Sequence, residues 1–307
     1  MSTRALVIGF GSIGARHARV LSELGVVVAV ASRHARSIPG MIVFAEIPEA
    51  LRIFAPDYIV VANETSQHMR TLAQLDAAGF SGRVLVEKPL KADLDDGIVT
   101  SAGNVFVAYN LRFHPVLKAL AARLCNDRVL TVQIYAGQYL PDWRPQTDYR
   151  LSYSAHRERG GGVLRDLSHE LDYIQQMFGT WRRLSALGGK VGSLEIDSDD
   201  AWTVMMETIG GEMLTLQLNY LDRAGRREVT VVGDEHSYRA DLVACTLQVD
   251  KTVQYFKVER DTTYIEQHKA MIDGRWDEVC SWDQGIAVLD TIARIEQAAT
   301  DRTWVSQ

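Results

Sequence analysis

Hydrophobic residues in the first third of the chain occur in short runs, many of them β-branched, separated by stretches of helical pattern. The runs lie at 5–8, 26–30, 58–61, 84–86 and 105–107. Each is apolar at consecutive positions, which is typical of strands that are buried on both faces. Strands alternating with helices predict βαβ units. We therefore predict a doubly wound, parallel α/β sheet in this part of the chain.

The pattern changes after residue 128, where apolar residues occupy every second position. In the run 213–220, one face carries Leu214, Leu216, Leu218 and Tyr220. This alternation predicts a half-buried antiparallel strand. Similar runs lie at 129–137, 183–189, 201–208, 228–232 and 252–258, and helical patterns return near 163–178, 264–274 and 284–299. The second part is predicted to be α+β, with a large, open, mainly antiparallel sheet.

Composition supports two packed domains. The chain has 307 residues, of which 47% are hydrophobic and 23% charged, as in ordinary globular proteins. A single core stops growing at about 250–300 residues, so we expect domains at 1–118 and 119–307. The net charge of −6 and the scattered basic residues argue against nucleic acid as a partner. No apolar run approaches the roughly 20 residues that span a bilayer.

The three cysteines, Cys125, Cys245 and Cys280, lie far apart and form no CxxC pair. Neither a zinc site nor a disulfide framework is therefore expected, and the cytoplasm is the expected location.

The first strand runs directly into Gly9-Phe10-Gly11-Ser12-Ile13-Gly14, which matches GxGxxG and opens a predicted helix. In this context Gly9 permits the tight turn, Gly11 admits a pyrophosphate and Gly14 allows close helix–strand packing. The free N–H groups at the helix start, including those of Ser12 and Ile13, favour an anion. The first domain is thus predicted to be a Rossmann domain that binds a dinucleotide.

The second strand ends in Ser32-Arg33, where NAD-binding folds usually carry an acidic residue for the ribose 2′-hydroxyl. A guanidinium at this position can bind a 2′-phosphate bidentately. We therefore favour NADP(H) over NAD(H), with Ser32 and Arg33 as cofactor contacts. The alternative is that Arg33 and Arg36 are solvated loop cations.

A later strand ends in Glu87-Lys88-Pro89. Ligands bind at the carboxyl ends of strands in such sheets, so Lys88 is predicted to project into the cofactor crevice. The alternative is a surface lysine at a strand end. Proline after it admits a cis peptide bond.

Gly160-Gly161-Gly162 leads into a predicted amphipathic helix that contains Asp166 and His169. Residues three apart share a helix face, and a carboxylate beside an imidazole orients it for taking a proton from a hydroxyl. The alternative is an exposed helix face with ordinary polar residues.

These motifs together resemble the glucose-fructose oxidoreductase / inositol dehydrogenase / rhizopine catabolism (GFO/IDH/MocA) family over nearly the whole chain. The resemblance rests on the glycine turn, on Glu87-Lys88-Pro89, on the segment 109–113 and on the glycine loop with Asp166 and His169. It implies a nicotinamide-dependent oxidoreductase acting on sugars, inositols, nucleotide-linked sugars or related polyols and ketones, and a sheet that often supports dimers or tetramers.

The resemblance also implies roles for individual residues. Lys88 matches the lysine that contacts the reacting oxygen and the nicotinamide ribose, while Asp166 and His169 match the family's carboxylate and histidine. Family members commonly space that pair by four residues, whereas here the spacing is three. Further cofactor contacts are predicted at Asn63, His68, Glu87 and Asn110. For His68, the alternative is a first-turn helix residue capped by Thr65 or Ser66.

The segment 138–150 is rich in aromatic residues and arginine. Aromatic faces stack on sugars or bases, and arginines bind phosphates. Arg112, Arg144, Tyr149 and Tyr153 are therefore predicted, with Asp166 and His169, to bind a nucleotide-activated sugar, as in relatives that make surface polysaccharides. The alternative is a structural lid that uses its aromatics for packing.

The predicted reaction moves a hydride between nicotinamide C4 and a secondary alcohol carbon, with His169 handling the hydroxyl proton and Lys88 stabilising the oxygen; it needs no metal. Two alternatives remain: a non-catalytic dinucleotide-binding regulator, and a reductase of a non-sugar substrate of the dihydrodiol or biliverdin type. A homodimer or homotetramer is expected.

Overall fold

The computed structural model describes residues 2–34, 37–91 and 104–307. The chain forms two compact units, Met1–Asn110 with Arg260–Leu289, and Leu111–Glu259 with Asp290–Gln307. The predicted division at 118/119 kept residues 260–289 in the second domain. In the structure these residues belong to the first unit, because they pack on its helix α1 and extend its sheet. Local sequence patterns carry no information about contacts between segments so far apart.

The first unit contains, among its described residues, a seven-stranded sheet in the order β15-β6-β5-β4-β1-β2-β3. All neighbours are parallel except β15, which is antiparallel to β6. The strands are β1 Arg4–Ile8, β2 Val27–Ala31, β3 Ile42–Phe44, β4 Tyr58–Val61, β5 Arg83–Val86, β6 Val105–Val107 and β15 Cys280–Ser281. Strands β1, β2 and β3 follow one another toward one edge of the sheet, and β4, β5 and β6 follow one another toward the other edge. The order therefore reverses between β1 and β4, as in a Rossmann domain.

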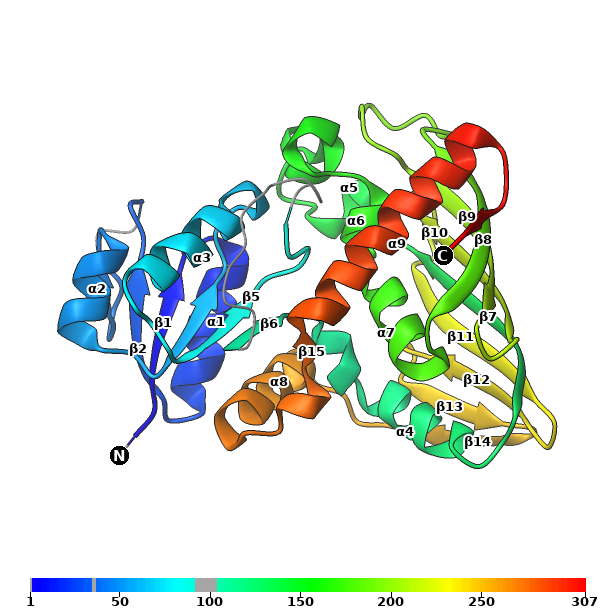
Figure 1. Cartoon of the computed structure of the whole chain (residues 1–307), viewed down its shortest axis with the longest axis horizontal. Coiled ribbons are helices and arrows are strands. Elements are labelled where there is room, and N and C mark those ends of the chain that lie inside the picture. Colours follow the sequence, from blue (N-terminus) through cyan, green and yellow to red (C-terminus); the bar gives the residue numbers. More distant parts are fainter. Residues whose placement is uncertain (1, 35–36, 92–103) are drawn as a thin grey trace. The chain divides into compact units, whose positions relative to one another are not determined.

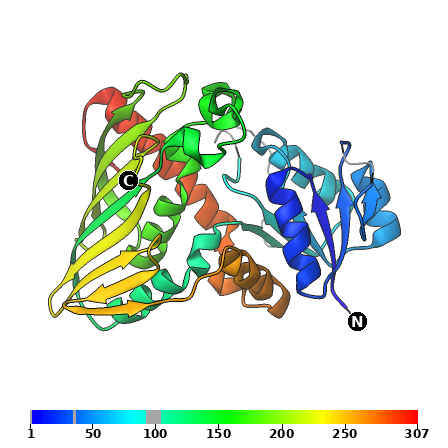
Figure 2. The ribbon, with the colours of Figure 1, turned by 180° about the vertical axis from the view of Figure 1, so that it is seen from behind.

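Helices cover both faces of this sheet, so β1 and β4 are buried along almost their whole length, as their unbroken apolar runs predict. Helices α1 and α3 lie on opposite faces (Figures 1 and 2). The helical segments of this unit are α1 Ser12–Glu23, α2 Ile47–Phe54, η1 Thr65–Gln67, α3 His68–Ala77, α8 Thr262–Asp273 and η7 Trp276–Glu278. The helix η3 (Asn110–Phe113) and the long helix α9 (Trp282–Asp301) continue into the second unit.

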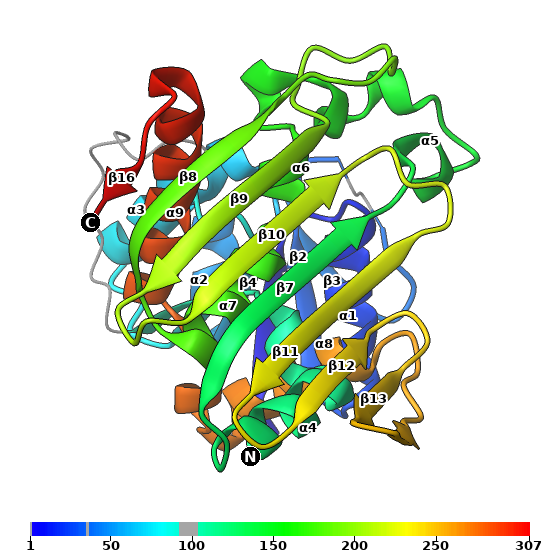
Figure 3. The same cartoon turned by 90° about the vertical axis from the view of Figure 1, so that its right-hand side faces the viewer.

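The second unit is built on a sheet in which nine strands are described, in the order β14-β13-β12-β11-β7-β10-β9-β8-β16. Its neighbours are antiparallel except for the pair β7 and β10 (Figure 3). The strands are β7 Val129–Gly137, β8 Trp181–Gly189, β9 Ala201–Thr208, β10 Met213–Asn219, β11 Arg226–Gly233, β12 Ser237–Asp241, β13 Thr246–Val249, β14 Thr252–Tyr255 and β16 Val305–Ser306. The predicted open, mainly antiparallel sheet is confirmed.

Helices cover one face of this sheet, which is the face that receives the buried residues of β10. The helical segments are α4 Pro115–Leu124, α5 Leu140–Trp143, η4 Tyr149–Leu151, η5 Tyr153–Ala155, η6 Arg157–Arg159, α6 Val163–Asp166 and α7 His169–Phe178. Leu214, Leu216, Leu218 and Tyr220 are all at most 2% exposed, as their alternation predicts.

The single helix predicted for 163–178 is wrong. The structure has two helices, because Leu167 leaves helical geometry at φ −97° and ψ 28° between α6 and α7. Asp166 is the last residue of α6 and His169 the first of α7, so they do not share one continuous helix face. The apolar spacing of Leu164, Leu167 and Leu171 is compatible with the break, since all three are still buried.

Candidate active site

The glycine turn after β1 is shaped by two close backbone approaches. Gly9 has φ +93°, and a Cβ on it would lie 2.6 Å from the Asn63 backbone nitrogen. A Cβ on Gly14 would lie 2.1 Å from the Gly9 carbonyl oxygen. Both glycines are therefore required by the packing of α1 against the strand ends.

Gly11 differs from these two glycines, because a Cβ on it would meet no described atom within 4 Å. It occupies the N-cap position of α1 and supplies no side-chain cap, so the first N–H groups of the helix face outward for another partner. Open space beside Gly11 and uncapped N–H groups fit a dinucleotide pyrophosphate.

The other predicted cofactor residues of this unit come together at the same edge of the sheet. Ser32, Asn63, Glu87 and Asn110 follow β2, β4, β5 and β6, which run parallel and end at one edge. Asn63 donates from Nδ2 to Thr71 Oγ1 at 2.8 Å, and Asn110 donates from Nδ2 to Thr263 Oγ1 at 2.9 Å. The side chain of Arg33 is exposed.

Lys88 is half-buried and follows β5, as predicted, and its peptide bond to Pro89 is cis. The Glu87 carboxylate fixes the start of this segment. Its Oε2 accepts from the Lys88 backbone N–H at 3.1 Å, and its Oε1 lies 2.8 Å from Nε2 of His17. Glu87 thus ties the lysine segment to helix α1.

His68 is 1% exposed and braces the segment that follows Lys88. Its Nδ1 lies 3.2 Å from the carbonyl oxygens of Pro89 and Leu90, and its Nε2 lies 3.2 Å from that of Asn63. Burial lowers the pKa of His68, opposed by the carbonyl contacts. This packing role was not predicted, and a contact between His68 and the cofactor stays a prediction.

In the second unit, Asp166 is 5% exposed and is held by two tyrosines. Tyr153 donates to Oδ1 at 2.5 Å, and Tyr220 donates to Oδ2 at 2.6 Å. Burial, and then the charge of Asp166, raise the pKa of both tyrosine hydroxyls well above the ordinary value, so both remain donors at neutral pH. The two donors fix the carboxylate plane.

The glycine loop makes this arrangement possible. A Cβ on Gly161 would lie 2.2 Å from the Tyr153 carbonyl oxygen, and Gly162 has φ +118° with Asp199 Oδ1 2.0 Å from the place of a Cβ. The loop backbone therefore passes directly over the residues that carry Tyr153. These glycines therefore serve close packing.

Three of the predicted substrate-binding residues, Arg112, Arg144 and Tyr149, have different surroundings. Arg112 donates from Nε and Nη2 to Asp172 at 2.8 and 2.6 Å, and both side chains are at most 3% exposed. Arg144 is exposed, and its charge reaches Tyr153, whose pKa it lowers against the larger effects above. Tyr149 accepts from the Glu195 backbone N–H at 3.2 Å. Substrate contacts of all three stay predictions.

Three side chains that hold predicted site residues in place were not themselves predicted as site residues. Tyr220 was placed on the buried face of its strand, and a tyrosine at the end of such a face is a signal for a polar partner. Asp172 lies 60 positions from its partner Arg112, so no local pattern indicates this pair. His17 is 0% exposed, and its contacts with Glu87 and His268 join segments far apart in the sequence.

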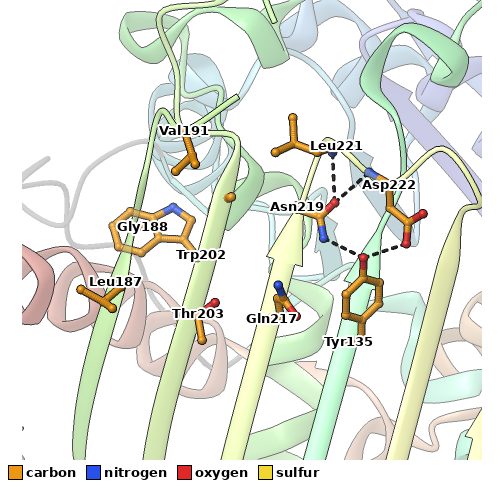
Figure 4. A pocket seen from close by; sticks show the side chains of 11 residues that line it. Tyr135, Leu187, Gly188, Val191, Trp202, Thr203, Gln217, Asn219, Leu221 and Asp222 are labelled. Atoms are coloured by element: carbon orange, nitrogen blue, oxygen red, sulfur yellow. Dashed lines mark hydrogen bonds between the residues drawn. The ribbon is translucent and has the colours of Figure 1, made fainter. Parts of the chain in front are cut away.

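A pocket of about 540 Å³ lies at one end of the face of the second sheet that the helices leave open (Figure 4). Tyr135, Trp202, Asn219 and Asp222 contribute to its wall, and none of the predicted site residues does. Asn219 donates to the Tyr135 hydroxyl at 3.0 Å, which donates to Asp222 at 2.7 Å. This pocket is separate from the predicted chemistry.

Two family descriptions match the chain. Residues 3–100 match "Oxidoreductase family, NAD-binding Rossmann fold", and residues 126–239 match "GFO/IDH/MocA C-terminal domain". The chain belongs to the GFO/IDH/MocA oxidoreductases. It is therefore an NAD-binding oxidoreductase, and the predicted resemblance is confirmed. Among the helices of the described residues, none has the length and apolar character needed to span a bilayer.

Two curated relatives share about a quarter of the aligned residues with this chain. An "Uncharacterized oxidoreductase" of Streptococcus pneumoniae serotype 4 is 26% identical over 297 residues, covering 87% of this chain and 78% of the relative. A 2,7-anhydro-N-acetylneuraminate hydratase of Mediterraneibacter gnavus is 27% identical over 213 residues, covering 65% of this chain and 56% of the relative.

Solved structures share the fold of the whole chain. A myo-inositol dehydrogenase from Corynebacterium glutamicum has a TM-score of 0.80 at 20% identity, covering 100% of this chain and 99% of the other. The WlbA dehydrogenase from Bordetella pertussis, in complex with NADH and UDP-GlcNAcA, has a TM-score of 0.78 at 17% identity, covering 100% and 98%. A levoglucosan dehydrogenase in complex with NADH has a TM-score of 0.83 at 16% identity, covering 100% and 99%.

The open space at Gly11 yields a direct test. Gly11→Ala should leave the thermal midpoint of unfolding unchanged, because its Cβ meets no described atom, but should weaken dinucleotide binding at least about tenfold by intruding where the pyrophosphate approaches. Titration of nicotinamide fluorescence, beside a thermal melt, measures both. Gly14→Ala is the matched control, which should lower the midpoint as well. Unchanged affinity in Gly11→Ala would contradict the assignment of the turn.

Proposed function

We propose that this protein transfers a hydride between a nicotinamide dinucleotide and a secondary hydroxyl or keto group of a sugar. One observation carries the proposal: Lys88 follows β5 at the same sheet edge as the glycine turn that follows β1. The Glu87 carboxylate accepts from the Lys88 backbone N–H and so holds the backbone that carries the lysine. A lysine side chain at that edge is suited to stabilising a reacting oxygen. The bound nicotinamide supplies or accepts the hydride.

In this proposal, residues of the chain bind the cofactor, stabilise charge on the reacting oxygen and transfer the hydroxyl proton. The N–H groups at the start of α1 hold the pyrophosphate, and Gly11 leaves room for it. Lys88 donates a hydrogen bond to the reacting oxygen and stabilises negative charge on it. His169 takes the hydroxyl proton in oxidation and returns it in reduction. Asp166, held by Tyr153 and Tyr220, accepts a hydrogen bond from a substrate hydroxyl.

The proposed substrate is a nucleotide-activated sugar of surface-polysaccharide synthesis. Support comes from the exposed Arg144 near Tyr153, which suits a phosphate, and from Tyr153 itself, which is 40% exposed although its hydroxyl is engaged. The fold is shared with a dehydrogenase crystallised with UDP-GlcNAcA. Arg112 is the weaker candidate for such a contact, because Asp172 already pairs with its guanidinium.

The relative from Mediterraneibacter gnavus favours a second candidate, since it is a hydratase. In this candidate the chain adds water to a sugar or removes it, with no net change in nicotinamide oxidation. Net appearance or loss of the reduced nicotinamide absorbance band separates the two candidates.

We further propose a cytoplasmic homodimer or homotetramer. The face of the second sheet that the helices leave open carries Leu187, Met205 and Met213, which are 75%, 49% and 63% exposed. Exposed apolar side chains grouped on one face support association.

The proposed roles of Lys88 and His169 predict that their removal lowers kcat but leaves dinucleotide affinity nearly unchanged. Lys88→Ala and His169→Ala should each lower kcat by about 10²–10⁴-fold, because each removes a group that acts on the reacting oxygen or its proton. Dinucleotide affinity should stay within about tenfold, since neither neutralises the pyrophosphate. Steady-state kinetics with nucleotide sugars, free sugars and inositols measures the first effect, and fluorescence titration the second.

Lys269→Ala and His236→Ala are matched controls in the same two units, at residues paired with Glu266 and Asp250. Both should keep wild-type kinetics. Full activity in His169→Ala would refute its proton-transfer role. Tight dinucleotide binding by the wild-type protein with no turnover on any substrate would favour a non-catalytic regulator.

NADP(H) preference is proposed from Arg33, which follows β2, where a carboxylate for the ribose 2′-hydroxyl is absent. Arg33→Ala should raise the Kd for NADPH by about 10–100-fold through the loss of charge-assisted hydrogen bonds, and leave the Kd for NADH within about twofold. Arg70→Ala, at an exposed position of α3, is the control. An equal effect on both dinucleotides would contradict the preference.

A further inference from the structure

Four side chains of the first unit form an unbroken line of contacts in its interior. The Tyr58 hydroxyl lies 3.0 Å from His268 Nδ1, His268 Nε2 lies 2.8 Å from His17 Nδ1, and His17 Nε2 lies 2.8 Å from Glu87 Oε1. They come from β4, α8, α1 and the segment after β5. We call this line the Tyr58–Glu87 chain. It ends at the carboxylate that accepts from the Lys88 backbone N–H.

Water has almost no access to these groups. His17 and His268 are 0% exposed, Tyr58 is 3% exposed, and the Glu87 side chain is 14% exposed. Every polar hydrogen in the line therefore needs an acceptor within it, because a buried donor without a partner is costly.

This requirement fixes the direction of the hydrogen bonds. With both imidazoles neutral, Tyr58 donates to His268 Nδ1, His268 donates from Nε2 to His17 Nδ1, and His17 donates from Nε2 to Glu87. Each ring then donates once and accepts once. In the opposite direction His268 would donate to the Tyr58 oxygen, and the tyrosine hydrogen would need a further acceptor. Within the described residues, the Tyr58 hydroxyl is bonded to His268 alone.

The surroundings agree with neutral groups at the far end of the chain. Burial raises the pKa of Tyr58 well above its usual value, and burial followed by the nearby His17 lowers the pKa of His268 well below its own. The ring of Tyr264 packs edge-on against His17 at 5.3 Å between centroids, and the Arg16 guanidinium lies over the Tyr264 ring at 4.2 Å from its centroid.

We propose that the Tyr58–Glu87 chain is a one-way hydrogen-bond relay that positions Lys88 for its reaction. It donates into the Glu87 carboxylate and holds it against the Lys88 backbone, so His17, His268 and Tyr58 are positioning residues. Because His17 belongs to α1, the relay also joins the helix that receives the pyrophosphate to the lysine segment. This inference rests on the proposed function of Lys88.

The first arm of the test does not depend on activity. Nuclear magnetic resonance on protein with isotope-labelled histidine reports the tautomer of each ring, and the missing signals of His17→Gln and His268→Gln assign the two residues. At neutral pH both rings should be neutral, with the hydrogen on Nε2. An Nδ1-protonated tautomer or an imidazolium at either residue would overturn the relay.

The second arm separates positioning from packing. In His17→Gln the side-chain amide replaces Nε2 and keeps the donation to Glu87, whereas His17→Leu loses it. The kcat of His17→Leu should fall by about 10–100-fold and that of His17→Gln by less than about fivefold, with the dinucleotide Kd within about threefold in both. Tyr264→Phe, which keeps the ring beside His17, should match the wild type. Equal losses in the Leu and Gln variants, or a parallel loss of dinucleotide affinity, would overturn the positioning role.

Tyr58→Phe provides a variant that keeps the fold if His17→Leu does not. It removes only the terminal donor and leaves Nδ1 of His268 without a hydrogen-bond donor, so kcat should fall by about 3–10-fold while both rings keep the hydrogen on Nε2. A kcat equal to that of the wild type, or a His268 hydrogen on Nδ1, would overturn the relay. Full activity in Lys88→Ala would instead refute the proposed function, whatever the tautomers show, so the two failures are distinguishable.

Discussion

The close approach of helix α1 to the ends of β1 and β4 is the constraint on which the first unit depends. It leaves no room for a side chain at Gly9 or Gly14, whose Cβ atoms would lie 2.6 and 2.1 Å from backbone atoms. The same approach aims the N–H groups of the helix start at the sheet edge and sets His17, one turn later, against Glu87. Helix α1 thus positions both the glycine turn and the lysine segment.

The sequence predicted those features that depend on local spacing. The consecutive apolar runs, the alternation in β10 and the glycine turn each determine a local structure, and the structure has all three. The break after Asp166 was missed because Leu164, Leu167 and Leu171 keep helical spacing across it. The return of α8 to the first unit was missed because it depends on contacts such as that of His268 with Tyr58, 210 positions apart.

The candidate site shows the same limit. The position at a strand end predicted Lys88, and the family resemblance added Glu87 and Asn110; all three follow parallel strands that end at one edge. The sequence did not predict which side chains hold the site residues in place. Tyr220 meets Asp166 across 54 positions, and Arg112 meets Asp172 across 60. Tyr220 holds the Asp166 carboxylate in place. Asp172 engages the Arg112 guanidinium, which leaves it less free to bind a substrate than its motif suggested.

The central claim is hydride transfer to or from a sugar carbon, and isotope transfer measures it most directly. The protein is incubated with NADPH or NADH deuterated at C4 of the nicotinamide, together with keto forms of nucleotide sugars, free sugars and inositols, and the products are analysed by mass spectrometry. The account predicts one deuterium on the carbon that bears the new hydroxyl, and a rate of deuterium transfer about 10²–10⁴-fold lower with Lys88→Ala. A sugar converted without deuterium from either dinucleotide would contradict it.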